Sequence, residues 1–274
     1  MTSPALQEIV ALLGCPAAGN PAQYLFERAI EAAELDWRFV TCDVAVADVA
    51  AAVAGVAALG FRGCLLAGPL REAALPAVVT LSPTATFSGG ITLVERTAAG
   101  LAGHMTAGRG VVEALRAHAD LATAGAVVVG ADTTGRAVAL ELALAGVGDL
   151  VVCDPDLARA TALVEAIGAV QATTASVAEW RTGMALPERA AIVVLGAAGR
   201  EGTFTGWRSD LVVADTLLAS RISPPAVEAR RQGGCIVDGL EIHAAQAAID
   251  FQALTGQEAD ADMLRDALDE FLSA

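Results

Sequence analysis

The sequence contains no lysine, since all 17 of its basic residues are arginine. This absence excludes every mechanism that needs a lysine ε-amino group. The chain has 32 acidic residues, which give it a formal net charge of −15. A chain with so few cations lacks the positive face that binds nucleic-acid phosphates, so we expect no nucleic-acid partner.

Long apolar runs are also missing, although 55% of the residues are hydrophobic. Glycine, aspartate, arginine or proline interrupts the apolar stretches well before the roughly 18 positions that a membrane-spanning helix needs. The segment from Met1 to Ala5 has no basic stretch leading into an apolar core, as a secretory signal would have. We therefore predict no membrane partner and a cytoplasmic location.

Few residues are arranged to bind a metal ion. The five cysteines are scattered without CxxC spacing, which argues against a zinc site or a disulfide framework. Most of them lie in apolar runs, so we expect buried small hydrophobic residues. Acidic residues near the C-terminus indicate a solvated helix face, and we predict no metal site. These acidic residues are Asp260, Asp262, Asp266, Asp269 and Glu270.

Apolar runs alternate with alanine-rich, helix-like segments, which is typical of an α/β protein with a mostly parallel sheet. The length of 274 residues favours two domains. In the first half the predicted strands are 9–13, 37–42, 64–67 and 90–94, and the predicted helices are 21–33 and 47–59. A glycine-rich stretch at 98–110, followed by a helix at 111–121, is the expected crossing between the domains.

The strongest local pattern lies in the second half. A strand at 126–129 precedes Gly130-Ala-Asp-Thr-Thr-Gly135, a helix at 136–145 and a strand at 149–153 that ends at Asp154. A βαβ unit with such a turn is typical of a Rossmann nucleotide-binding domain. Further strands are expected at 191–195, 211–214 and 235–237, and two C-terminal helices at 240–254 and 259–272.

The glycine turn predicts a dinucleotide site for NAD or NADP. The first glycine of such a turn permits its tight bend and the third permits close packing of helix on strand, roles that fall to Gly130 and Gly135. Asp154 stands where an acid accepts the ribose 2′-hydroxyl, which favours NAD, although Asp154-Pro155 also suits a turn or a helix N-cap. The expected cofactor-binding residues of this segment are Gly130, Ala131, Asp132, Thr133, Thr134, Gly135, Arg136 and Asp154.

Asp132 occupies the second glycine position and has two interpretations. Its carboxylate would repel a pyrophosphate bound at the helix N-terminus. The repulsion energy of two unit charges about 4 Å apart is about 1 kcal/mol in water and about 4 kcal/mol at an effective dielectric of 20. Alternatively, Asp132 caps the helix in a domain that has kept the fold and lost the ligand. The sequence leaves both open.

Several short stretches, taken in order from Gly14 to Gly256, resemble the shikimate dehydrogenase family. Gly14-Cys-Pro16 is similar to its opening Gly-x-Pro turn, and residues 63–72 have the frame of its Gly-x-Asn-Val-Thr-x-Pro-x-Lys-Glu segment. Residues 89–92 match its Ala-Val-Asn-Thr stretch, 103–108 its Gly-x-Asn-Thr-Asp-Gly segment, and 239–246 its Gly-x-x-Met-Leu-x-x-Gln stretch.

The resemblance implies a domain order and a set of site residues. A substrate-type α/β domain covers 1–105, a Rossmann NAD(P)-binding domain covers 106–244, and residues 245–274 return as helices to the first domain. The resemblance places Gly239 beside the nicotinamide. It assigns Asn20, Arg71, Thr92 and Gln246 to the substrate site.

The motifs also depart from the family pattern. Arg71 stands at the catalytic lysine position and cannot release a proton at neutral pH. Ala107 stands at the catalytic aspartate position, and Leu65 and Ala67 replace the asparagine and threonine of the lysine motif. We therefore predict a shikimate dehydrogenase-like protein that is impaired for shikimate oxidation, with its cleft kept as a binding or partner-contacting scaffold.

The alternative hypothesis is an active, NAD-preferring oxidoreductase for another small hydroxy or keto substrate that bears a carboxylate. Arg71 would pair with the carboxylate, and His104 or His243 would supply the proton. His104 could instead satisfy backbone groups in a turn, and His243 could be a partly buried helix residue. His118 is interpreted as a solvated helix residue without a role. So alanine-rich a chain is also compatible with a homodimer.

Overall fold

The computed structural model describes residues 7–273, which divide into two compact units. The first unit ends at Thr106 and resumes at Gln246, and the second runs from Ala107 to Ala245. The domain borders expected from the sequence fall one residue earlier in each case. The substrate and cofactor roles of the two units remain predictions.

A six-stranded sheet forms the centre of the first unit, in the order β2-β1-β3-β5-β6-β4. Its strands are β1 (Glu8–Gly14), β2 (Trp37–Asp43), β3 (Gly63–Leu66), β4 (Thr80–Leu81), β5 (Leu93–Thr97) and β6 (Gly100–His104). The β3–β5 and β5–β6 pairs are antiparallel and the other pairs are parallel. Within β1, residues Val10 to Leu13 are all buried, because helices cover both faces of the sheet.

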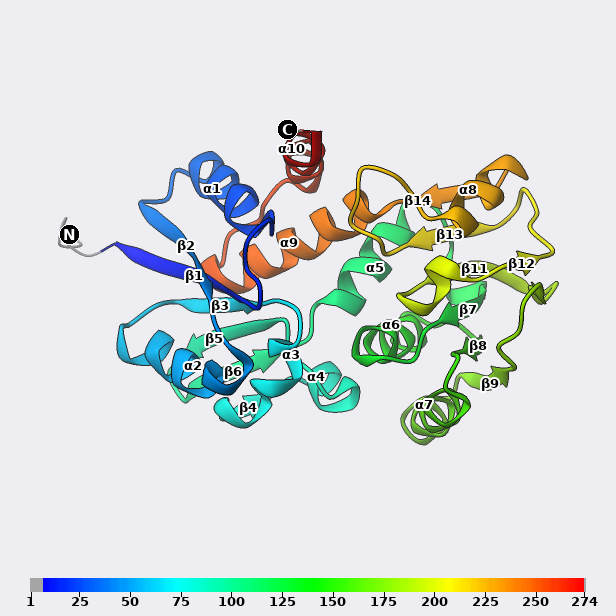
Figure 1. Cartoon of the computed structure of the whole chain (residues 1–274), viewed down its shortest axis with the longest axis horizontal. Coiled ribbons are helices and arrows are strands. Elements are labelled where there is room, and N and C mark those ends of the chain that lie inside the picture. Colours follow the sequence, from blue (N-terminus) through cyan, green and yellow to red (C-terminus); the bar gives the residue numbers. More distant parts are fainter. Residues whose placement is uncertain (1–6, 274) are drawn as a thin grey trace. The chain divides into compact units, whose positions relative to one another are not determined.

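Helices α1 (Ala22–Ala32) and α10 (Ala261–Ser273) lie on one side of this sheet, and α2 (Val49–Ala58) lies on the other (Figure 1). The rings of Phe26 in α1 and Phe39 in β2 have centroids 4.9 Å apart. Phe251 of α9 (Gly239–Thr255) packs against Phe26 at 5.8 Å. This aromatic cluster holds the C-terminal end of α9 in the first unit. Shorter helices are α3 (Leu70–Ala73), α4 (Pro83–Ser88), η1 (Val46–Asp48) and η2 (Leu75–Ala77).

The second unit is built on an all-parallel six-stranded sheet in the order β14-β13-β11-β7-β8-β9. Its strands are β7 (Gly125–Val129), β8 (Asp149–Cys153), β9 (Thr174–Ala178), β11 (Ala190–Leu195), β13 (Val212–Asp215) and β14 (Cys235–Val237). Counted from the first strand of the unit, this is the 3-2-1-4-5-6 order of the Rossmann fold.

The connections of the second unit are mostly helical, as parallel strands require. These helices are α5 (Ala107–Arg116), α6 (Thr133–Leu144), α7 (Leu157–Val170), α8 (Pro224–Arg231), η3 (Leu121–Thr123) and η4 (Ala198–Glu201). A small parallel pair, β10 (Met184–Ala185) with β12 (Phe204–Thr205), lies outside the main sheet. Phe204 packs edge-on against Trp180 and Trp207, with ring centroids 6.3 and 5.8 Å apart.

The predicted α/β class, the Rossmann sheet and the return of the C-terminal helices are confirmed. The glycine-rich crossing at 98–110 was wrong in detail, because residues 100–104 form β6 between β5 and β4. Gly103 is needed there, since a Cβ atom would lie 2.8 Å from Cγ2 of Ile91. The helix expected at 111–121 is instead α5, which begins at Ala107 and ends at Arg116.

The structure also bears on the expectations about membrane-spanning helices, metal sites and cysteines. Among residues 7–273, no helix is long and apolar enough to cross a membrane, and no group of three or more histidine, cysteine, aspartate or glutamate side chains is placed to hold a metal ion. The cysteines are free thiols, but their expected burial is wrong for two of them. Cys64 and Cys153 are buried within strands, whereas Cys15 and Cys235 are exposed because each stands at the end of its strand or in a turn.

Candidate functional site

The glycine turn joins β7 to α6 in the second unit. Gly130 has a φ of +120°, a conformation that favours glycine. A Cβ atom on Gly135 would lie 2.0 Å from the carbonyl oxygen of Gly130, so the helix approaches the turn too closely for any side chain there. The backbone therefore has the tight bend and close packing of a dinucleotide turn.

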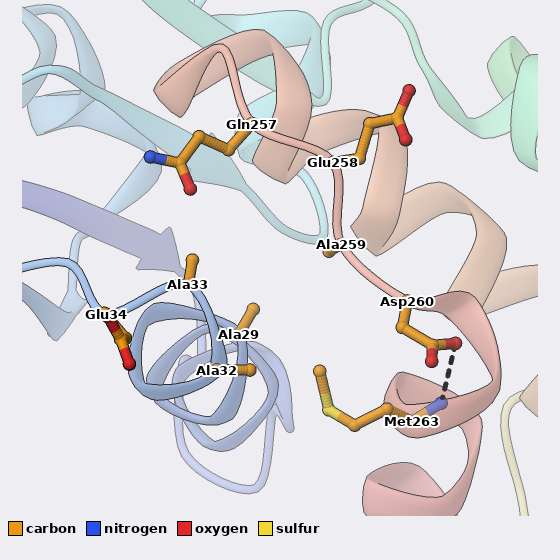
Figure 2. Close-up of a pocket in the computed structure, with 9 residues that line it drawn as sticks. All are labelled: Ala29, Ala32, Ala33, Glu34, Gln257, Glu258, Ala259, Asp260 and Met263. Carbon is orange, nitrogen blue, oxygen red and sulfur yellow. Dashed lines mark hydrogen bonds between the residues drawn. The ribbon is translucent and has the colours of Figure 1, made fainter.

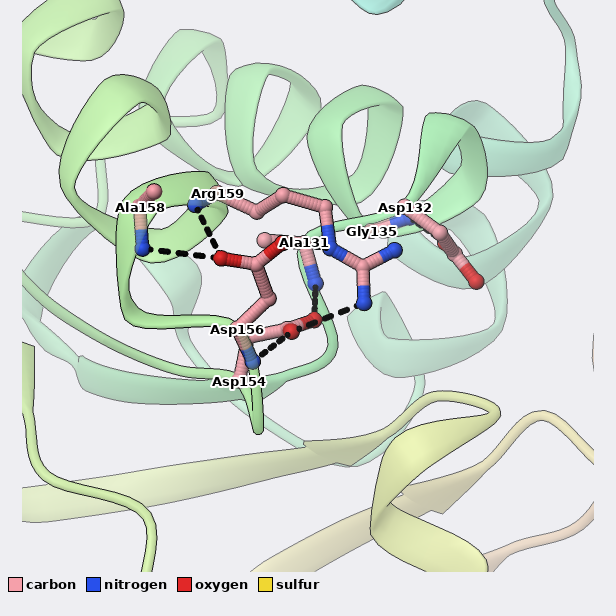
Figure 3. A network of polar contacts seen from close by, with 7 residues as sticks. All are labelled: Ala131, Asp132, Gly135, Asp154, Asp156, Ala158 and Arg159. Atoms are coloured by element: carbon pink, nitrogen blue, oxygen red, sulfur yellow. Dashed lines mark hydrogen bonds and ion pairs between the residues drawn. The ribbon is translucent and has the colours of Figure 1, made fainter.

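Asp132 is the N-cap of α6 (Figure 3). Its Oδ1 atom accepts a hydrogen bond of 2.8 Å from the Gly135 N–H, one of the amides that a phosphate would otherwise meet at this helix end. The residue is partly buried and has extended backbone angles, with a φ of −70°. The capping interpretation is thus realised in the geometry, and the carboxylate brings a negative charge to the helix N-terminus.

Asp154 follows β8 and is almost completely buried, with 3% of its surface exposed. Its Oδ2 atom accepts a hydrogen bond from the Ala131 N–H at 2.7 Å, and its Oδ1 atom accepts bonds from the Asp156 N–H at 2.8 Å and from Nη2 of Arg159 at 3.1 Å (Figure 3). The carboxylate therefore ties the glycine turn to the start of α7, which leaves it little capacity for a ribose hydroxyl.

The other predicted cofactor residues lie near these two acids or at the start of α9. Thr133, Thr134 and Arg136 belong to the first turn of α6 and are partly buried. Gly239 begins α9, and a Cβ atom on it would lie 1.9 Å from the carbonyl oxygen of Leu217. Gly239 is thus a close-approach glycine between two backbone segments.

Two of the predicted substrate-site residues, Thr92 and Gln246, form one hydrogen-bonded cluster with Thr106 in the first unit. The hydroxyls of Thr92 and Thr106 are 2.8 Å apart, and the Thr106 N–H donates to the Thr92 hydroxyl at 2.9 Å. Gln246 donates from Nε2 to the Thr106 hydroxyl at 3.3 Å. Both threonines are buried and Gln246 is partly buried, so this is a neutral and largely buried polar cluster. Thr106 was not predicted, although its place in the 103–108 motif was a usable signal.

Arg71 and Asn20 make local contacts. Arg71 lies in α3, half-buried, and its Nε atom donates to the carbonyl oxygen of Leu66 at 3.2 Å. Asn20 accepts a hydrogen bond from the Ala22 N–H at 2.9 Å and so fixes the entry into α1. The Asn20 side chain thus has a structural use, whereas the guanidinium of Arg71 is a permanent cation in the first unit.

Two histidines were candidate proton donors, and the structure gives each a partner. Nε2 of His104 on β6 lies 3.1 Å from Oε2 of Glu95 on β5, and both side chains are 31% exposed. Nε2 of His243 lies 3.4 Å from the carbonyl oxygen of Thr216. His104 thus belongs to a cross-strand imidazole–carboxylate pair and not to a turn.

A hollow of about 540 Å³ lies between α1 and the segment that joins α9 to α10 (Figure 2). Alanines and Met263 form its apolar lining, and Glu34, Glu258 and Asp260 add negative charge. No predicted site residue lines this hollow. It is therefore separate from the Thr92, Thr106 and Gln246 cluster.

Sequence reasoning missed a second polar cluster in the second unit. His118, interpreted as a solvated helix residue, lies beyond the end of α5 and contacts both Cys235 and Glu241. His118 is more than 100 residues from both Cys235 and Glu241 in the sequence, so no local motif could reveal these contacts. The only available signal was the position of Cys235 next to a Gly-Gly turn.

Known proteins resemble this chain over nearly its whole length. No protein-family model matches it. The shikimate dehydrogenase (NADP(+)) of Moorella thermoacetica is 31% identical over 288 residues, covering 97% of this chain and 94% of the relative. Among solved structures, 5-ketofructose reductase of Gluconobacter sp. strain CHM43 has a TM-score of 0.91 at 25% identity and covers 97% of this chain and 99% of its own.

A third similar protein is shikimate 5-dehydrogenase from Thermus thermophilus, solved in complex with NADP(H) and shikimate. Its TM-score is 0.81 at 26% identity, with 97% of this chain and 100% of that chain covered. The relatives match both units of the present fold, and the identity to the Moorella protein extends across both. The chain therefore belongs to the shikimate dehydrogenase family.

Proposed function

We propose that this chain is a shikimate dehydrogenase-family protein that is impaired for shikimate oxidation. The observation that carries the proposal is the loss of the acid–base pair, since Arg71 and Ala107 stand at the lysine and aspartate positions of the family motifs. A guanidinium stays protonated at neutral pH and an alanine methyl carries no exchangeable proton. General acid–base catalysis contributes about 10²- to 10⁴-fold to a rate, so a loss of that order is expected.

The changed surroundings of the substrate cluster support this proposal. Leu65 and Ile91 are buried apolar side chains at motif positions where the family has asparagine. The Thr92, Thr106 and Gln246 cluster that remains is neutral, which suits hydroxyl or keto oxygens better than a carboxylate. Arg71 is the cation of this unit that the family motifs place near the substrate.

The cofactor class that we propose is NAD(P), with weakened affinity. The relatives include proteins named for NADP, and Gly130 has the positive φ and Gly135 the close backbone approach that a dinucleotide turn needs. A bound nicotinamide cofactor would supply or accept a hydride. Asp132 opposes the pyrophosphate, and the Asp154 carboxylate disfavours a 2′-phosphate, so we propose that NAD is preferred over NADP.

A second candidate function is reduction of a different small keto substrate. The likeness to 5-ketofructose reductase, at 25% identity and a TM-score of 0.91, favours it. In this version, Arg71 would orient a keto or carboxylate oxygen, and the imidazole of His104, held by Glu95, would donate a proton to the forming hydroxyl.

A substrate assay of the purified chain separates the two candidates. Shikimate would be tested with NAD⁺ and NADP⁺, and 5-ketofructose and small keto acids with NADH and NADPH. No turnover with any pair supports the impaired scaffold, whereas reduction of a keto compound that His104→Gln abolishes supports the second candidate. Oxidation of shikimate at a rate comparable with the Moorella relative would overturn both.

A further inference from the structure

Three side chains of the second unit form a line of polar contacts that the proposed function does not use. The Sγ atom of Cys235 lies 3.6 Å from Nδ1 of His118, and Nε2 of the same ring lies 2.8 Å from Oε1 of Glu241. Cys235 is exposed, and the side chains of His118 and Glu241 are 30% and 28% exposed. A thiol, a base and a group that orients the base thus meet at the protein surface.

Three separate elements place these groups. His118 stands just beyond the C-terminal end of α5. Cys235 begins the edge strand β14, and its N–H donates to the carbonyl oxygen of Leu211 at 2.9 Å. Glu241 lies in the first turn of α9, where its N–H donates to Oδ1 of Asp238 at 3.0 Å. Hydrogen bonds donated by the backbone N–H groups of Cys235 and Glu241 therefore hold both ends of the line, and the imidazole lies between them.

We propose that Cys235 is a nucleophilic thiol that small, uncharged hydroperoxides oxidise to a sulfenic acid, with His118 as its base. A nucleophile within hydrogen-bond reach of a base, with the base oriented by a third group, is the arrangement that activates thiols. Glu241 is a positioning residue, because it contacts the imidazole and not the sulfur.

The reaction balances within this group of residues. His118 takes the thiol proton on Nδ1, the thiolate sulfur attacks the terminal peroxide oxygen, and the O–O bond breaks. The imidazolium returns the proton to the departing oxygen, so a thiol and a hydroperoxide give a sulfenic acid and an alcohol or water. The sulfur is oxidised by two electrons and the peroxide is reduced by two.

The negative charge around Cys235 determines which class of oxidant can approach its thiol. The chain has a net charge of −15, and the Glu241 carboxylate lies in the same cluster, so anionic peptide disulfides are repelled while a neutral hydroperoxide is not. The buried thiols differ, since burial raises the pKa of Cys64 to about 12 and that of Cys153 to about 11. Cys15 is exposed, but no imidazole hydrogen-bonds its thiol within residues 7–273.

Peptide mapping of the full chain tests the proposal. Trypsin can cleave this chain only after arginine, because the chain has no lysine, and arginines lie between all five cysteines. Each cysteine is therefore on a different peptide, and each thiol can be followed separately. The protein would be treated with limiting tert-butyl hydroperoxide and trapped with dimedone, and in parallel with iodoacetamide. We expect sulfenic acid on Cys235 first, and alkylation of Cys235 at least about tenfold faster than of Cys15.

Two variants isolate the roles of the base and the carboxylate. We expect His118→Asn to slow both reactions of Cys235 at least about tenfold, and Glu241→Gln to slow them less, while Cys15 keeps its rate. Glu113→Gln, an exposed carboxylate of α5, is the matched control and should change neither. Circular dichroism would confirm that each variant is folded.

Three outcomes would overturn the proposal. Equal reaction rates of Cys235 and Cys15 would show that the Cys235 thiol is not activated. An unchanged rate of Cys235 in His118→Asn would show that His118 is not its base. Fast alkylation without any sulfenic acid would show that hydroperoxide is not the oxidant.

Discussion

Asp154 and Ala131 are joined by a hydrogen bond of 2.7 Å, in which the backbone N–H of the glycine turn donates to a buried carboxylate. The same carboxylate accepts from the Asp156 N–H, so one side chain fixes two loops of the Rossmann sheet. This relationship uses the acid at the end of β8 for structure, at the position where a dinucleotide fold can use it for ribose.

Replacing Asp154 with alanine should therefore destabilise the second unit. The change leaves the buried Ala131 N–H without its acceptor, which costs about 1–3 kcal/mol, and it also removes the acceptor of the less buried Asp156 N–H. Urea unfolding would measure the loss. Asp210→Ala, which removes an exposed carboxylate of the same unit, is the control, and an equal effect of the two variants would contradict the structural role.

Asp132→Gly should raise nucleotide affinity with little loss of stability. The variant removes a negative charge near the pyrophosphate, a gain of at least about 1 kcal/mol or roughly fivefold, whereas glycine at an N-cap costs only a few tenths of a kcal/mol. Calorimetric titration with NAD, NADP, NADH and NADPH would measure the gain. Asp260→Gly, which removes the N-cap of α10, serves as the matched control. Tight binding of NAD by the unaltered chain, unchanged in Asp132→Gly, would exclude the opposing role.

Gly135→Ala should destabilise the chain, because its methyl group would meet the Gly130 carbonyl oxygen at 2.0 Å. Overpacking of this kind costs about 1–3 kcal/mol. Gly168→Ala is the matched helical control, since a Cβ atom there has no neighbour within 4 Å and should raise helix stability by up to about 1 kcal/mol. Denaturant unfolding of both variants provides the measurement. We expect the unfolding free energy to fall in Gly135→Ala and to rise in Gly168→Ala. Changes of the same sign in both variants would contradict the close approach of α6 to the turn.

We predict that the chain loses stability at high pH because the thiol of Cys64 is buried. Burial, with a smaller contribution from Cys42, raises the pKa of Cys64 from 9.0 to about 12, so the folded chain holds this proton more tightly than the unfolded chain. The stabilisation is complete below pH 9 and is lost as the pH rises from about 9 towards 12. Unfolding free energies at pH 8 and pH 10.5 should differ less in Cys64→Ala than in the unaltered chain. An identical difference in both would refute the linkage.

Much of the fold followed from local sequence patterns. The apolar runs before Gly130 and Asp154 predicted β7 and β8, because parallel strands buried on both faces need continuous apolar residues. The strand β6 escaped prediction because Gly100 and Gly103 mimic a loop. Gly100 has a positive φ of +121° and Gly103 packs closely against Ile91, and only the tertiary structure defines these two requirements.

The site was predictable only where it rests on a motif. The order of the family motifs pointed to Arg71, Thr92 and Gln246, whereas the hydrogen bonds that join Thr92 to Thr106 depend on strand pairing. His118 meets Cys235 and Glu241 only through tertiary folding, because it lies more than 100 residues from each of them in the sequence. No local period or spacing in the sequence encodes such a contact.

The most direct test of the account compares shikimate oxidation by the unaltered chain and by the Arg71→Lys/Ala107→Asp double variant, with NAD⁺ or NADP⁺ at saturation and the Moorella relative assayed in parallel. We predict that the unaltered chain is at least about 100-fold slower than the relative, and that the double variant is faster than the unaltered chain. Shikimate turnover by the unaltered chain at the rate of the relative would contradict the claim that the loss of these two side chains impairs the reaction.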